Sequence, residues 1–194
     1  MPVRLQIERG HATADGKALR GPLARRAEAM LALLQLEKAE LSLVLSGDEQ
    51  IHELNKTYRG KDKPTDVLAF PMREGDFGRF HAALPSRLLG DVIVSVPTAK
   101  RQAREAKRGG LAEITMLVAH GLLHLLGWDH ETPAKDKRMR AETDRLVAAA
   151  EAADPPARKV AKAAKPHVRP AAAPAAPSLR GSARAKQKRD KRAK

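Results

Sequence analysis

Cysteine is absent from the 194-residue chain, which excludes a disulfide, an iron–sulfur centre and a thiolate zinc site. Aromatic residues make up only 3% of it, so rings on which nucleic-acid bases could stack are scarce. Long apolar runs are also missing. The most hydrophobic stretch, residues 111–126, contains Glu113, His120 and His124 and is too short and too polar to span a bilayer. With no apolar run of a secretory signal at the start, we expect a cytoplasmic protein without a membrane partner.

The net charge of +14 is concentrated at one end of the chain. Residues 155–194 carry thirteen Lys or Arg and one acidic residue, a net charge of +12, which leaves +2 on residues 1–154. A segment of Ala, Pro, Lys and Arg buries too little apolar surface to offset the entropy of ordering its backbone. We therefore expect one domain at residues 1–153 and a disordered basic tail at residues 154–194. The tail is either a solubilising extension or an arm that binds RNA.

The first 153 residues alternate between strand-like and helix-like patterns. Strands are predicted for Val3–Ile7, Leu41–Ser46, Asp66–Phe70 and Leu89–Val96. Helices are predicted for Pro22–Glu37, for a segment capped by Asp48 and ending at Tyr58, and for Thr98–Arg108, Leu111–Leu126 and Ala134–Ala152. This order predicts an α+β domain with a four-stranded mixed sheet and about five helices. The helix from Leu111 should be central and buried, because apolar residues surround it on nearly every side.

Three histidines occur within eleven residues on that central helix and just after it. His120 and His124 are one helical turn apart, so both rings can reach one metal ion. Gly127 can end the helix in the left-handed conformation and return the chain, which places His130 as a third ligand. Three protein nitrogens leave a fourth position open, as in a catalytic zinc site. We expect one Zn²⁺ per chain, although three imidazoles also suit copper, nickel or iron.

The spacing of these histidines is that of the metzincin proteases, with one departure. Those enzymes have a glutamate directly after the first histidine, where it acts as the general base. This chain has Gly121 at that position. The missing carboxylate argues against a peptidase, and the basicity must come from another group or from a metal-bound hydroxide.

The stretch His-Gly-Leu-Leu-His-Leu-Leu-Gly-Trp-Asp-His at residues 120–130 resembles the signature of the YbeY family of endoribonucleases and rRNA maturation factors. Residues 54–71 and 89–95 are similar to two further blocks of that family. The resemblance implies a single-strand-specific, zinc-dependent endoribonuclease that acts in rRNA maturation, including 16S rRNA 3′-end formation, and in ribosome quality control. It implies zinc at His120, His124 and His130, a functional arginine at Arg59, and rRNA and the small ribosomal subunit as partners.

Arg59 follows a predicted helix, and a guanidinium there could hold two phosphate oxygens of an RNA. The alternative is that it pairs with Asp62 or Asp66. Asp129 could orient a histidine ring or cap the turn. Further candidates for RNA binding are Lys61 and Lys63 in the same loop and Lys100, Arg104 and Arg108 at helical spacing.

Two other functions remain open on the sequence alone. One is a metal hydrolase of another substrate, such as a peptide. The other is a non-catalytic ribosome assembly factor with a structural metal, because three ligands leave room for a fourth from elsewhere in the chain.

Overall fold

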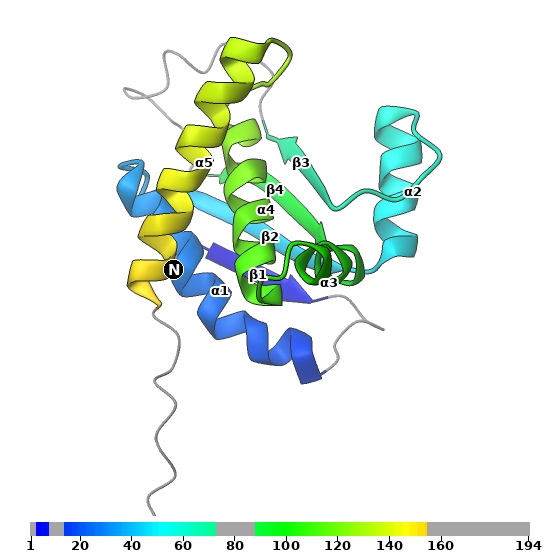
Figure 1. Ribbon diagram of the computed structural model, residues 1–194, viewed down its shortest axis with the longest axis horizontal. Coiled ribbons are helices and arrows are strands. Elements are labelled where there is room, and N and C mark those ends of the chain that lie inside the picture. The colour runs from blue at the N-terminus through cyan, green and yellow to red at the C-terminus, as the bar shows by residue number, and fades with distance from the viewer. Residues whose placement is uncertain (1–2, 8–13, 73–87, 155–194) are drawn as a thin grey trace, which may run out of the picture. The chain divides into compact units, whose positions relative to one another are not determined.

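Four strands and five helices make up the described part of the chain, residues 3–7, 14–72 and 88–154 of this computed structural model (Figure 1). Their number confirms the prediction. The elements follow in the order β1 (Val3–Ile7), α1 (Ala14–Leu33), β2 (Glu40–Ser46), α2 (Asp48–Arg59), β3 (Val67–Pro71), β4 (Leu88–Ser95), α3 (Val96–Glu105), α4 (Gly110–Leu125) and α5 (Pro133–Ala153).

The strands form one mixed sheet in the order β1-β2-β4-β3. β1, β2 and β4 are parallel, with Leu43 paired to Leu5 on one side and to Val92 on the other. β3 runs antiparallel to β4, with Ala69 opposite Val92, and forms an edge of the sheet. The α+β class and the mixed sheet are therefore confirmed, and among the described strands only β4 pairs with β3.

The hydrophobic core lies between the sheet and the helices α1, α4 and α5, which cover one of its faces (Figure 1). Leu41, Leu43 and Leu45 alternate along β2 and are fully buried, as expected for the covered face of a strand. α4 is buried on most sides and supplies ten buried residues, so the prediction of a central helix is confirmed. None of the described helices has the length and apolar character needed to cross a membrane.

The first helix differs from the prediction at both ends. α1 begins at Ala14, so Pro22 lies inside the helix and not in its first turn. Arg20 in the added turns donates a hydrogen bond of 3.2 Å to the carbonyl oxygen of Leu5, which holds this part of α1 against β1. The helix ends at Leu33 and not near Glu37, and Gln35 just beyond it has a φ of 59°.

The prediction that Asp48 caps α2 is wrong, because Gly47 is the N-cap residue and Asp48 begins the helix. The Asp48 carboxylate instead accepts hydrogen bonds from Ser95, from Thr98 at 2.7 Å and from Arg101 at 2.8 Å. Ser95 also caps α3 by accepting from the Thr98 backbone N–H at 3.2 Å. This cap starts α3 at Val96, which the sequence had assigned to the strand.

Asp154, the first residue of the expected tail, contacts the helical layer. Its carboxylate accepts a hydrogen bond of 2.9 Å from Arg25 Nε and lies 3.4 Å from Nε of the buried Arg26. Arg26 in turn donates to the hydroxyl of Thr115 on α4 at 3.0 Å. These contacts connect the end of α5 to α1 and α4. The rest of the expected tail lies outside the described residues.

Candidate metal centre

α4 and the turn that follows it bring three imidazoles together. His120 and His124 project from the last turns of α4, and their Nε2 atoms are 3.1 Å apart. Gly127, with a φ of 79°, reverses the chain so that His130 joins them. One ring nitrogen from each histidine lies within 4.8 Å of the others. A tetrahedral ion with metal–nitrogen bonds of about 2.1 Å separates its ligands by roughly 3.4 Å, so the three residues fit a metal ion.

The protonation states also suit a metal. His124 Nδ1 lies 2.9 Å from the carbonyl oxygen of Trp128, and a carbonyl only accepts, so Nδ1 carries the proton. The Nε2 atom that faces His120 is then an acceptor in the neutral ring. Burial and the neighbouring imidazoles lower the pKa of His120 to about 4, and burial also lowers the pKa of His124. Both rings are therefore neutral at pH 7 and can bind a cation.

Gly121 contacts the sheet so closely that a side chain there would overlap its neighbours. A Cβ at this position would lie 2.7 Å from a methyl carbon of Val92 and 3.3 Å from one of Val67. The metzincin glutamate would occupy this position in the motif. The described structure thus gives a physical reason for its absence: α4 packs with this residue directly on β3 and β4.

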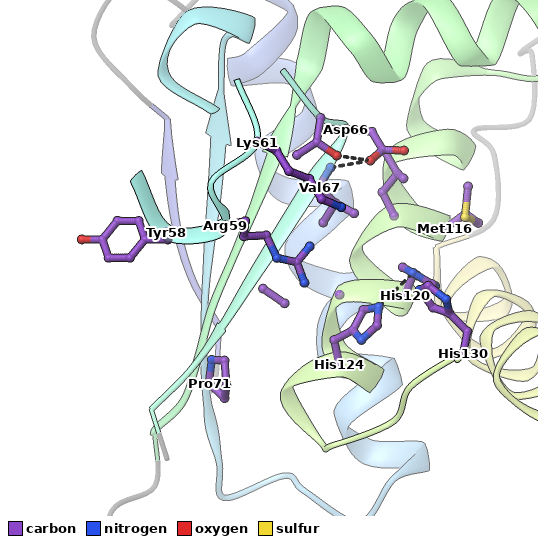
Figure 2. A pocket seen from close by; sticks show the side chains of 14 residues that line it. Tyr58, Arg59, Lys61, Asp66, Val67, Pro71, Met116, His120, His124 and His130 are labelled. Carbon is purple, nitrogen blue, oxygen red and sulfur yellow. Dashed lines mark hydrogen bonds between the residues drawn. The ribbon is translucent and has the colours of Figure 1, made fainter. Parts of the chain in front are cut away.

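A cleft of about 900 Å³ opens beside the three imidazoles. Its walls come from the end of α2 and the loop after it, from β3 and from α4 (Figure 2). Arg59 lines this cleft and points toward His124, and its positive charge contributes to the lowered pKa of that histidine. The cleft therefore combines a potential metal centre with a cationic group that can bind an anion.

Within the described residues Arg59 forms no ion pair, although the sequence offered two carboxylates as partners. Asp62 is bound by His52 at 2.7 Å and by Lys56 at 2.9 Å. Asp66 accepts hydrogen bonds from the Val67 N–H, from Thr65 and from Gln102. With both carboxylates held elsewhere, the Arg59 guanidinium is available to a ligand.

Hydrogen bonds with α2 hold the loop after Arg59 in place. Gly60 ends α2 with a φ of 66°, a conformation that favours glycine. The buried Asn55 donates from its side chain to the carbonyl oxygen of Lys63 at 2.7 Å, and its own carbonyl accepts from the Lys61 N–H at 3.2 Å. These bonds fix the course of the loop that carries Lys61 to the cleft.

The other predicted residues are not all at the cleft. Lys61 lines it, whereas Lys63, Lys100, Arg104 and Arg108 do not. Arg108 pairs instead with the buried Glu113 at 2.9 Å. These four residues remain predictions for RNA binding, and no described contact favours them.

Asp129 contacts the turn and α5. Its carboxylate accepts from the Glu131 N–H at 3.2 Å and from Lys135 at 2.8 Å. The acceptor for the His124 ring is the Trp128 carbonyl. These contacts correspond to the alternative in which Asp129 caps the turn.

Sequence reasoning missed several residues that line the cleft, among them Tyr58, Asp66 and Met116. Met116 carries no local signal, because it reaches the cleft only through the packing of α4 against β3. Asp66 was predicted only as a possible partner of Arg59 and not as a residue of the cleft. Tyr58 had one available signal, its position next to Arg59.

Comparison with known proteins agrees with this geometry. The family model described as Endoribonuclease YbeY matches residues 8–151. The chain is 44% identical over 131 residues to the Endoribonuclease YbeY of Aquifex aeolicus, covering 68% of this chain and 83% of that protein. It is 43% identical over 164 residues to that of an Anaeromyxobacter species, covering 81% and 80%. The solution structure of TM1509 from Thermotoga maritima matches with a TM-score of 0.54 at 26% identity, covering 77% of this chain and 89% of that one. The chain therefore belongs to the endoribonuclease YbeY family.

Proposed function

We propose that the protein is a zinc-dependent endoribonuclease that cleaves single-stranded RNA in the cytoplasm. Its substrate is rRNA on or near the small ribosomal subunit, where it acts in 16S rRNA 3′-end formation and in ribosome quality control. One observation carries the catalytic part: three convergent imidazoles face an arginine without an ion-pair partner among the described residues, across a cleft of about 900 Å³. Membership of the family supports RNA as the substrate.

The proposed chemistry needs two positive charges at one phosphate, a metal ion and the guanidinium group of Arg59. A zinc ion held by His120, His124 and His130 would supply Lewis acidity. The carbonyl oxygen of Trp128 holds His124 in the tautomer whose Nε2 carries a lone pair and would bind the metal. Arg59 binds two oxygens of the scissile phosphate and stabilises the charge that grows on them. Lys61, two residues after Arg59, lines the same cleft and adds positive charge for the RNA backbone.

The first test is cleavage of a labelled single-stranded RNA by purified protein, with the metal content measured on the same sample. We expect about one zinc per chain in the wild type, and loss of both metal and cleavage in His124→Ala, since two imidazoles hold zinc weakly. His167→Ala, in the basic tail, is the matched histidine control and should keep both. Full metal occupancy in the wild type, together with equal trace cleavage by the wild type and His124→Ala, would contradict the proposed enzymatic activity. It would favour a ribosome assembly factor with a structural metal.

Arg59→Ala tests the phosphate clamp separately from the metal. We expect the variant to keep its metal, because Arg59 is not a ligand, and to lose about 100-fold in kcat, the scale of one missing charge-stabilising donor. Arg59→Lys is the matched control: it keeps the charge but cannot bind two oxygens at once, so its activity should be intermediate. Wild-type cleavage by Arg59→Ala would remove Arg59 from the mechanism.

A further inference from the structure

Tyr58 is the most exposed aromatic side chain among the described residues. It has 66% of its surface exposed, although it lines the cleft beside Arg59. The ring of Trp128, by contrast, packs partly into the core. A phenol ring left in water at the edge of a binding cleft is available to a flat ligand.

The orientation of this ring is set by a second aromatic residue. Phe70 on β3 contacts Tyr58 edge to face, with ring centroids 5.2 Å apart and an interplanar angle of 73°. Because Val67, Ala69 and Pro71 line the cleft, Phe70 belongs to the opposite set of side chains on β3. Phe70 thus supports the Tyr58 ring from the side away from the metal centre, while most of the Tyr58 ring remains in solvent.

The two last residues of α2 point in different directions. Figure 2 shows Arg59 directed toward His124, whereas the ring of Tyr58 lies on the other side of Arg59 with its hydroxyl turned away from the histidines. A strand of RNA whose phosphate is bound by Arg59 and that leaves the cleft over the end of α2 would meet the ring of Tyr58. Single-stranded RNA has unpaired bases, and an exposed aromatic ring is the side chain that binds their faces.

We infer that Tyr58 is a base-stacking subsite, which binds one nucleobase of the RNA strand adjacent to the phosphate held by Arg59. The inference rests on the function proposed above and adds a reason for selecting single strands, because a paired base cannot leave its stack to meet the ring. The subsite accepts any base, since every base has a π face. The ring of Tyr58, and not its hydroxyl, makes the contact.

The test uses the full chain and a set of single-stranded RNAs of one sequence, each with one abasic ribose at successive positions around the cleavage site. Two quantities are measured: kcat/KM for cleavage, and the dissociation constant by fluorescence anisotropy. For the wild type we expect one position at which the abasic ribose lowers kcat/KM and raises the dissociation constant, each by about tenfold, the scale of one stacked base. In Tyr58→Ala the intact RNA should lose a similar factor, and the abasic ribose should cost nothing more.

Two variants separate stacking from other effects. Tyr58→Phe keeps the ring and should keep the abasic penalty. Leu33→Ala removes an exposed apolar side chain on α1, outside the cleft, and should also keep it. The same abasic penalty in wild type and in Tyr58→Ala, in both measurements, would overturn the subsite. Absence of cleavage by the wild type would overturn the proposed function instead, and the anisotropy measurement would still decide the inference about Tyr58.

Discussion

The chemistry of the cleft depends on single residues, and they differ in how far the sequence alone could predict their roles. The histidine triad could be predicted from the sequence because helical spacing and a glycine turn are local geometry. The acceptor that orients His124 could not, since it is the backbone carbonyl of Trp128 and no residue type indicates it. Gly121 is a similar case: the sequence showed that a carboxylate was missing, but only the packing against Val92 gives the reason.

Gly121→Ala should destabilise the protein, because its Cβ would lie 2.7 Å from a Val92 methyl carbon. Gly110→Ala is the matched control: it also adds a methyl group to α4, but the nearest atom is Lys100 Cγ at 4.0 Å. Alanine gains more helix propensity at Gly121, inside the helix, than at Gly110, its first residue. The difference between the two variants is therefore a lower bound on the cost of overpacking, about 1–3 kcal/mol in the free energy of unfolding. Urea unfolding measures that difference. Equal stability of the two variants would show that α4 can move away from β4 at little cost.

At the scale of elements, polar side chains join helices that the sequence treats as separate. The sequence suggested Asp48 as an N-cap because a short acidic residue preceded a helical pattern. The local pattern could not show that β4 ends beside the start of α2, where Ser95, Thr98 and Arg101 bind the same carboxylate. The start of α1 was predicted wrongly for the same reason. Proline favours the first turn of a helix, so the local pattern placed the start at Pro22, whereas α1 begins at Ala14 and its added turns contact β1.

Asp48 should contribute to stability in a pH-dependent way. Partial burial raises the pKa of its carboxyl group, but the hydrogen bonds from Arg101, Ser95 and Thr98 outweigh burial and lower the pKa from 3.8 to about 2. Because the pKa is lower in the folded than in the unfolded protein, the ionised carboxylate stabilises the fold at any pH above the pKa of the unfolded chain. This contribution is lost as the pH falls from about 4 toward 2. The shift corresponds to about 2 kcal/mol near neutral pH.

Asp48→Asn tests this contribution by urea unfolding between pH 7 and pH 3. We expect the variant to be less stable than the wild type at pH 7. The difference in stability should narrow below pH 4, because the Asp48 carboxyl group of the unfolded wild-type chain takes up its proton there while the folded one is still ionised. Glu49→Gln changes the exposed neighbouring residue and serves as the control, with little expected effect at any pH. A gap that stays constant across this range would show that shape and not charge makes Asp48 important.

The whole molecule combines a nearly neutral folded domain with a strongly basic end. The fold class followed from the sequence because the alternation of strands and helices is visible along the chain. The strand order β1-β2-β4-β3 could not be predicted in the same way, because it depends on pairings between strands far apart in the sequence, such as that of Leu43 on β2 with Val92 on β4. The cleft is a product of that order, because it is the edge strand β3 that faces α4 and the histidines. The charge asymmetry, in contrast, is read directly from composition: +12 on residues 155–194 and +2 on the rest.

From that asymmetry we predict that residues 155–194 determine the salt dependence of RNA binding. If residues 155–194 bind the RNA backbone, the logarithm of the affinity falls with the logarithm of the salt concentration by about 0.7 for each phosphate contacted in a single strand. Ending the chain at Asp154 keeps its contacts with Arg25 and Arg26 and should flatten this slope. A full-length variant with the tail's Lys and Arg replaced by Gln should match the truncated protein, since charge and not length determines the slope. Fluorescence anisotropy at several salt concentrations measures it, and an equal slope in all three proteins would assign the backbone contacts to the folded domain, with the tail a solubilising extension.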